Sequence, residues 1–288
     1  SDFNETPNID RIAAENLQFQ QYYSQPVCSP ARSCLMTGEN VLRTGITNYL
    51  PADNSVHLDP DEFVAMPSVL NNAGYRTGII GKWHMCAGYN AYPTDGAPVY
   101  HGFDDVIMSE QKYIANGDYF APYFFLPQVT GVEEGKYLVD LMNETAVSYI
   151  EEKAEEDQPF FLYLSHYATH TILDAPQDTL DYFNAKRGTP TTDKNTKDKN
   201  PYLAAMLKHI DDGVGMVEET LERLGIAENT LLIISSDNGG SGEFTLNGEL
   251  RGNKRQIYEG GIRDPLIIKW PERVKEAKQV EFMTSVMD

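Results

Sequence analysis

The sequence predicts an α/β protein with a mostly parallel central sheet that carries helices on both faces. Three features support this fold class. Helical and strand-like segments alternate along the chain, short apolar runs such as residues 160–164 and 231–234 suit buried strands, and polar motifs follow directly after several of these runs. In open α/β sheets, functional sites gather at the carboxyl ends of the strands, so the same pattern predicts a site there.

Each expected element has its own signal in the sequence. Thr6-Pro7 opens the first helix, the alternation after it indicates a strand, and Gly38, Gly74 and Gly225 are typical helix stops. No repeat or clear linker divides the chain, so residues 1–288 are interpreted as one domain. The strands are expected at residues 17–23, 75–80, 160–165, 230–235 and 265–270, and the helices at 6–16, 30–36, 66–73, 136–156 and 201–224.

Composition restricts the possible partners. The chain carries 23 basic and 43 acidic residues, for a net charge of −20, which disfavours nucleic acid and anionic membrane surfaces. We interpret most of this charge as a solvated acidic surface. No apolar run is long enough to cross a bilayer. The three cysteines match no zinc spacing and are too few for a disulfide framework in a chain of 288 residues.

The sharpest motif is Cys28-Ser29-Pro30-Ala31-Arg32. Proline suits a first helical turn, which places Cys28 at a helix N-terminus, where backbone N–H groups favour negative charge. Arg32 lies one turn later and can return to the same place. On these residues alone, a nucleophile or anion site beside a cation and a buried structural cysteine with a surface arginine are equally open.

Two further motifs follow expected strands. Gly81-Lys82-Trp83-His84 comes directly after the strand at 75–80, and His170 follows the strand at 160–165, with His166 as its rival. A lysine and a histidine two residues apart can point into one pocket. A surface lysine with a partly buried structural histidine is the commoner arrangement for an isolated pair, and a lone loop histidine is usually structural or solvated.

The last two motifs lie near the C-terminal end. Asp237-Asn238 ends the strand at 230–235, where a carboxylate and a carboxamide suit a hard cation such as calcium or magnesium, or an Asx turn. The segment Arg251-Gly252-Asn253-Lys254 by itself is consistent with a basic surface loop.

Taken together, the five motifs resemble those of a known enzyme family. Cys28-Ser29-Pro30-Ala31-Arg32 is similar to the signature of type I, arylsulfatase-like sulfatases, in which the cysteine is oxidised to formylglycine, and the other motifs stand in the family's order. The resemblance covers nearly the whole chain. It implies an alkaline phosphatase-like fold and the activity of a sulfuric ester hydrolase.

The resemblance also implies a role for each motif. Cys28, as a hydrated formylglycine, would attack sulfur, and with Asp237 and Asn238 would bind Ca²⁺ or, alternatively, Mg²⁺. His84 would orient or deprotonate the hydrate, and His170 would assist the leaving alcohol, although the prolines that usually flank this histidine are absent. The cations that would bind the sulfate are Arg32, Lys82 and Lys254.

The family begins with a strand that ends in an Asp-Asp pair, which supplies two more metal ligands, and ends with a C-terminal subdomain. We expect both to lie outside residues 1–288, so the chain is interpreted as a partial sulfatase catalytic domain. It is therefore expected to bind calcium weakly and to show little sulfatase activity by itself.

The expected partners are a sulfated small molecule or glycan and a formylglycine-generating maturation enzyme, and family context implies a periplasmic or secreted location. Residues 48–57 and 89–127, rich in Tyr, Asp and Asn, are expected to form the pocket rim. Two alternatives stay open: a phosphonate or phosphate monoester hydrolase of the same superfamily, and a non-catalytic sulfoglycan-binding pseudoenzyme.

Overall fold

The computed structural model describes residues 3–51, 56–86, 96–112 and 119–288. The chain divides into two compact units, each considered below by itself. Unit 1 comprises Ser1–Val27, Leu173–Val286 and Asp288, and unit 2 comprises Cys28–Ile172 and Met287. The described helices include none that is long and apolar enough to span a membrane.

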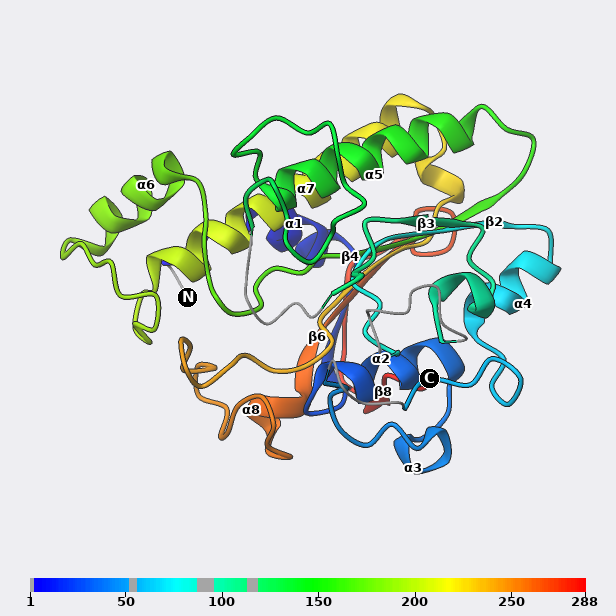
Figure 1. Ribbon diagram of the computed structural model, residues 1–288, viewed down its shortest axis with the longest axis horizontal. Coiled ribbons are helices and arrows are strands. Elements are labelled where there is room, and N and C mark those ends of the chain that lie inside the picture. Colours follow the sequence, from blue (N-terminus) through cyan, green and yellow to red (C-terminus); the bar gives the residue numbers. More distant parts are fainter. Residues whose placement is uncertain (1–2, 52–55, 87–95, 113–118) are drawn as a thin grey trace. The chain divides into compact units, whose positions relative to one another are not determined.

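Unit 2 is built on a parallel sheet with strand order β3-β2-β4 (Figure 1). Helix α5 covers one face: Gly78 of β2 lies under the ring of Tyr149, where an added Cβ would come within 2.6 Å of the ring carbon Cζ. Only glycine therefore allows this close approach of helix to strand. The elements are β2 (Arg76–Gly81), β3 (Asp105–Ile107), β4 (Phe160–Ser165) and α5 (Leu138–Ala154).

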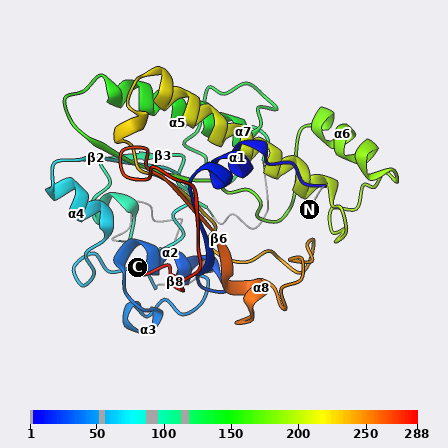
Figure 2. The same ribbon diagram turned by 180° about the vertical axis from the view of Figure 1, so that it is seen from behind.

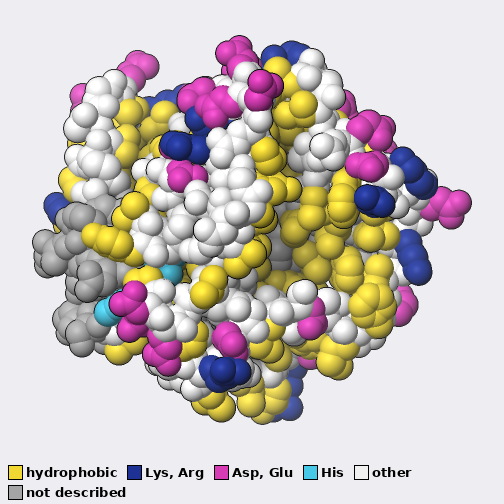
Figure 3. Space-filling model, turned by 90° about the vertical axis from the view of Figure 1, so that its right-hand side faces the viewer, with side chains coloured by type: hydrophobic (Ala, Val, Ile, Leu, Met, Phe, Trp, Pro, Cys, Tyr) yellow, Lys and Arg dark blue, Asp and Glu magenta, His cyan; other side chains and the backbone are white. Residues whose placement is uncertain are grey.

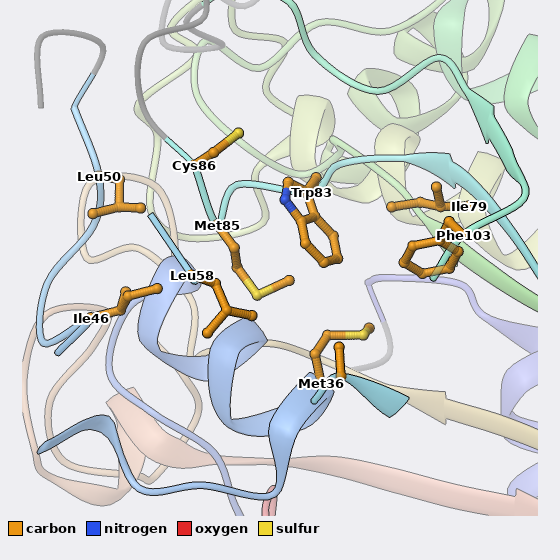
Figure 4. Close-up of a cluster of buried hydrophobic side chains, with 10 residues drawn as sticks. Met36, Ile46, Leu50, Leu58, Ile79, Trp83, Met85, Cys86 and Phe103 are labelled. Carbon is orange, nitrogen blue, oxygen red and sulfur yellow. The ribbon is translucent and has the colours of Figure 1, made fainter. Parts of the chain in front are cut away.

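The main apolar core of unit 2 joins β2 to helix α2 (Cys28–Thr37). Ile79 of β2, Trp83 just beyond the strand and Met36 of α2 are each at most 1% exposed, and Figure 4 shows them in one cluster. This packing ties the chain after β2 to the helix that begins at Cys28. Shorter helices complete the unit: α3 (Val41–Thr44), α4 (Met66–Asn72) and η2 (Pro98–His101).

Unit 1 contains a mixed sheet with strand order β5-β6-β1-β7, in which β8 also pairs with β1. Strand β6 is antiparallel to both β1 and β5, whereas β7 and β8 run parallel to β1. The strands are β1 (Leu17–Tyr23), β5 (Leu232–Ser235), β6 (Arg263–Lys269), β7 (Lys278–Val280) and β8 (Thr284–Ser285).

Helix α1 (Pro7–Glu15) lies alongside α7 (Pro201–Arg223) in both ribbon views (Figures 1 and 2). Asp211 of α7 is fully buried and accepts the N–H groups of Asn8 and Ile9 at 3.2 and 2.8 Å, so one helix caps the N-terminus of the other. The remaining helices of unit 1 are α6 (Gln177–Arg187), η4 (Ala227–Asn229) and α8 (Glu259–Ile262).

The structure confirms the α/β class and all ten expected helices and strands, with ends shifted by a few residues. The single mostly parallel sheet was wrong for the described residues, which form one parallel and one mixed sheet. The chain between β5 and β6 contains only loops and the one-turn helix α8, and antiparallel neighbours need no long crossover helix. The apolar run at 231–234 was also wrong as a fully buried strand, because Ile233 is 54% exposed on β5, which ends the described strand order.

The surface agrees with the charge expected from composition. On the face drawn in Figure 3, acidic side chains are scattered among lysines, arginines and apolar groups. The charge on this face is therefore dispersed, as in an ordinary solvated surface.

A buried histidine should make unit 2 acid-labile. His101 is 1% exposed, its Nε2 lies 3.1 Å from the Leu58 carbonyl oxygen, and burial lowers its pKa from 6.5 to about 4. The unfolded chain therefore binds this proton at higher pH than the folded chain, so the free energy of unfolding should fall as the pH drops from 6.5 to about 4. In urea titrations at a series of pH values, His101→Gln should show a shallower decline, by up to about 1.4 kcal/mol per pH unit. Equal slopes for both proteins would contradict this assignment.

Candidate active site

Three loops of unit 2 begin at the same edge of its sheet. Because β2, β3 and β4 are parallel, their carboxyl ends meet there, and the segments that follow carry Lys82 and His84, Glu110, and His170. This edge is where polar residues were expected.

Cys28 is the first residue of α2 and is 3% exposed. Its Sγ lies 3.2 Å from Nδ1 of His84. A helix N-terminus favours a negative charge, and a neighbouring imidazole can accept a proton. The structure thus pairs the predicted nucleophile position with a predicted histidine.

The contact made by the second ring nitrogen of His84 determines which of the two nitrogens carries the hydrogen. Nε2 lies 3.1 Å from the backbone oxygen of Leu50. A carbonyl oxygen can only accept, so Nε2 must carry the hydrogen. In the neutral ring, Nδ1 then presents its lone pair to Cys28. The geometry makes His84 a proton acceptor for whatever group residue 28 carries.

Arg32 is 6% exposed and ties the Lys82 segment to β4. Its Nη1 donates to the backbone oxygen of Lys82 at 2.9 Å and to Oγ of Ser165 at 2.6 Å, with the Tyr163 hydroxyl at 3.2 Å. The backbone N–H of Lys82 donates to the Ser165 oxygen at 2.8 Å, and the lysine itself is 3% exposed. Two cationic side chains are therefore buried at this edge of an otherwise acidic protein.

His170 and its rival His166 have different surroundings. Nδ1 of His170 lies 3.0 Å from the Thr171 oxygen and so carries a hydrogen, and the Tyr119 hydroxyl donates to the His170 backbone oxygen at 2.9 Å. Nε2 of His166 contacts Oδ1 of Asn143 in α5 at 2.8 Å, and burial lowers the pKa of His166 to about 4. His166 is thus held by a helix and is neutral near pH 7, and His170 stays the preferred prediction.

In unit 1, Asp237 and Asn238 follow β5 directly. Oδ1 of Asn238 is buried and has no hydrogen-bond partner, whereas its Nδ2 donates to the Gly239 oxygen at 2.9 Å. A buried amide oxygen without a donor is costly, and a bound hard cation would satisfy it. The described residues contain no cluster of three His, Cys, Asp or Glu side chains placed to hold a metal.

Asp264 of β6 is a further buried carboxyl in unit 1. It accepts a hydrogen bond from the Ser24 hydroxyl and is 7% exposed. Burial, with a smaller contribution from the nearby charge of Asp237, raises the pKa of Asp264 to about 7. A second acidic group therefore lies within electrostatic range of the expected metal ligand.

Lys254 is placed beside the same loop by backbone contacts. Its N–H donates to the Gly240 oxygen at 3.0 Å, and Nδ2 of Asn247 lies 3.1 and 2.9 Å from the Gly240 and Gly260 oxygens. An added Cβ at Gly239 would collide with the Gly260 backbone, so the two glycine loops pack directly on each other. Asp237, Asn238 and Lys254 thus belong to one packed loop group.

The structure therefore brings Cys28, Arg32, Lys82 and His84 into one contact network, places His170 at the same sheet edge, and groups the three remaining residues within unit 1. Joint action of the two groups stays a prediction. Of the expected rim, residues 52–55, 89–95 and 113–118 lie outside the described residues.

Sequence reasoning missed three residues of this network, namely Tyr163, Ser165 and Glu110, and it also missed Asn247 in the loop group of unit 1. Ser165 ends a strand and Glu110 follows one, so their positions carried a signal that was not used. Tyr163 lies within a strand, where only the alternation of side chains indicated its direction. Asn247 lies in a loop without a local pattern, so the role of Asn247 depends on tertiary packing.

The sulfatase family model matches residues 1–288. The chain belongs to the sulfatase family. Mouse N-acetylgalactosamine-6-sulfatase is 30% identical over 99% of this chain and 56% of its own length. Mouse arylsulfatase J is 32% identical over 90% of this chain and 43% of its own length. The sulfatase chain thus spans about half the length of these curated relatives.

Solved structures agree with this fold. Ps i-CgsB, crystallised in complex with k-i-k-neocarrahexaose, is 28% identical to this sulfatase chain, with a TM-score of 0.81 over 98% of this chain and 64% of its own. PsFucS1 sulfatase from Pseudoalteromonas sp., at 23% identity and a TM-score of 0.71, shares the fold. The expected sulfatase-like fold is therefore confirmed.

Replacing Arg32 should weaken unit 2 far more than replacing an exposed arginine. Arg32→Met keeps the length of the side chain and leaves the Lys82 oxygen and the Ser165 hydroxyl without a buried donor, so we expect a loss of about 2–4 kcal/mol in urea unfolding. Arg43→Met is the matched control, because the Arg43 side chain is 72% exposed and its pair with Glu39 lies at the surface. The control should change stability by less than about 0.5 kcal/mol. Similar losses in both variants would refute the structural role of Arg32.

Proposed function

We propose that this chain is the main part of the catalytic domain of a sulfatase that hydrolyses sulfate esters of carbohydrates. The observation that carries the proposal is the pair formed by Cys28 Sγ and His84 Nδ1 at 3.2 Å, at a helix N-terminus and beside the buried Arg32. These features suit an oxyanion-handling nucleophile at residue 28. The proposal includes oxidation of Cys28 to formylglycine by a maturation enzyme.

Formylglycine would supply a hydrated aldehyde as nucleophile, and a divalent cation, Ca²⁺ or alternatively Mg²⁺, would supply positive charge against the sulfate oxygens. Sγ of Cys28 marks the place that an oxygen on the same carbon would take. His84 Nδ1 can accept a proton from that oxygen, because Nε2 is already engaged with Leu50. His84 therefore acts as the base.

A sulfate ester is an anion, so a nucleophile can approach it only where its charge is neutralised. Arg32 and Lys82 are buried at the edge where residue 28 lies, and burial strengthens the interaction of a cation with an anion. Lys254 is proposed as the third cation. Together these groups would bind the sulfate in a protein whose net charge is −20.

Asp237 and Asn238, with the oxidised residue 28, are proposed to hold the metal. The residues present fit a hard cation in one respect that the structure shows, namely the buried Oδ1 of Asn238 without a donor. His170 is proposed to assist the leaving alcohol through Nε2, because Nδ1 carries its hydrogen toward the Thr171 oxygen.

The proposed substrate class is a sulfated glycan. The names of two relatives support it, because one is an N-acetylgalactosamine-6-sulfatase and another was crystallised with a neocarrahexaose. The tyrosines and acidic residues of the expected rim suit sugar hydroxyls. We also propose that the enzyme is periplasmic or secreted, because an exported enzyme would encounter such glycans.

The decisive variant is Cys28→Ala in the full-length enzyme, produced together with its maturation enzyme. Turnover of an aryl sulfate should fall by at least about 1,000-fold, because the nucleophile is lost. Cys34→Ala is the control, since Cys34 is fully buried in the same helix and burial raises its pKa to about 11. The control should keep most of the activity. Faster turnover of an aryl phosphate than of an aryl sulfate would instead support the phosphoester alternative.

The metal ligands are tested by calorimetry on the full-length protein. Asp237→Asn and Asn238→Leu should each weaken calcium binding by at least about 10-fold, because each removes an oxygen ligand or its charge. Asp212→Asn is the control in the same unit, because the Asp212 side chain is 44% exposed and pairs with Lys208. Unchanged calcium affinity in both ligand variants would rule out this site.

A further inference from the structure

Glu110 is a buried acid in the loop after β3. Its side chain is 3% exposed, and its carboxylate accepts hydrogen bonds from the backbone N–H of His84 at 2.6 Å and that of Trp83 at 3.0 Å. The Tyr167 hydroxyl lies 2.9 Å from the same carboxylate. These donors satisfy both carboxylate oxygens, as burial of such a group requires.

The backbone that Glu110 holds has an unusual conformation. His84 has a φ of +57°, in the left-handed region that residues other than glycine seldom adopt. Such a conformation persists only where the surroundings hold it. The two oxygens of Glu110 bind the N–H groups of Trp83 and His84, which flank the Cα of Trp83. They therefore hold the peptide group whose nitrogen belongs to the φ torsion of the strained residue.

The direction of the His84 ring depends on this turn. With the backbone as observed, Nε2 reaches the Leu50 oxygen at 3.1 Å and Nδ1 reaches Cys28 Sγ at 3.2 Å. A return of φ to negative values would redirect the bond from Cα to Cβ and carry the ring away from both partners. The proton-accepting nitrogen is therefore aligned with residue 28 only while the turn is held.

We propose that Glu110 is a positioning residue: its carboxylate holds the left-handed turn that points His84 Nδ1 at residue 28. The catalytic consequence of this role rests on the proposed function, whereas the Cys28–His84 pairing can be tested without it. A carboxylate is needed rather than an amide, because both of its oxygens face N–H donors. A glutamine would turn its own NH₂ group toward one of them.

The first test uses the unmodified protein, in which residue 28 is still cysteine. Iodoacetamide alkylates the thiolate, forming a carbon–sulfur bond and releasing iodide, while the thiol proton passes to His84 Nδ1. Peptide mapping by mass spectrometry gives the rate at Cys28 and, as an internal reference for unfolding, at the fully buried Cys34. Glu110→Gln should slow alkylation of Cys28 by roughly 10- to 100-fold and approach the rate of His84→Ala, with Cys34 still protected.

Glu218→Gln is the matched control. Glu218 is a buried acid of unit 1, 4% exposed and bonded to Lys269 at 2.5 Å, so its replacement removes the same charge without touching the turn. An effect of Glu110→Gln on Cys28 no larger than that of the control would overturn the proposal. Reactivity of Cys34 would show that Glu110→Gln has unfolded, and Glu110→Asp then replaces it as the test variant. The shorter carboxylate of aspartate cannot reach both N–H groups. A folded Glu110→Asp protein with unchanged Cys28 reactivity would therefore also overturn the proposal.

The second test uses the full-length matured enzyme, with rates divided by the formylglycine content measured by mass spectrometry. Glu110→Gln should lower kcat by roughly 10- to 100-fold while KM changes little, because the base is misdirected and the sulfate-binding cations are not. If Glu110→Gln slows alkylation of Cys28 but the matured enzyme with Glu110 intact has no sulfatase activity, the positioning role is supported and the proposed function is refuted. Unchanged kcat in an active enzyme would refute the positioning role.

Discussion

The guanidinium of Arg32 connects the parts of unit 2 on which the candidate site depends. It reaches from helix α2 to the backbone of Lys82 after β2 and to Ser165 at the end of β4. A buried cation is tolerated only when its donors are matched by acceptors, so these contacts constrain one another. The same residue that presents positive charge also aligns the start of α2, and hence Cys28, with the loop that carries His84.

The contrast between surface and interior shows how an acidic protein could bind the proposed anionic substrate. The net charge of −20 is screened by water and salt over distances of about 10 Å. Arg32 and Lys82 are at most 6% exposed, and interactions in such places are screened much less. Buried cations at the sheet edge would therefore favour the proposed sulfate ester at short range, whereas long-range steering of a sulfated polymer would be unfavourable.

Features of the fold and of the candidate site could be predicted from the sequence where neighbouring residues alone indicate them. The helix at 201–224 has an apolar period and a glycine stop, and the structure places α7 there. The motifs after β2, β4 and β5 were also identified in advance, because strand ends are recognisable. The antiparallel direction of β6 was not predicted, since strand direction depends on the path of the intervening loop. The roles of Glu110 and Asn247 depend on contacts between segments many residues apart, for which one sequence holds no pattern.

In each unit, features that cost stability coincide with residues predicted to act in the site, or lie close to one. His84 adopts a left-handed backbone, Asn238 buries an amide oxygen without a donor, and Asp264 has a raised pKa beside Asp237. Each such feature disfavours folding by about 1–3 kcal/mol, and the burial of apolar side chains in the same unit must offset this cost. A chain that folded for stability alone would place a glycine at 84 and an apolar residue at 238. That both positions instead carry groups able to accept a proton or bind a cation is the physical reason to propose catalytic roles for them rather than packing roles.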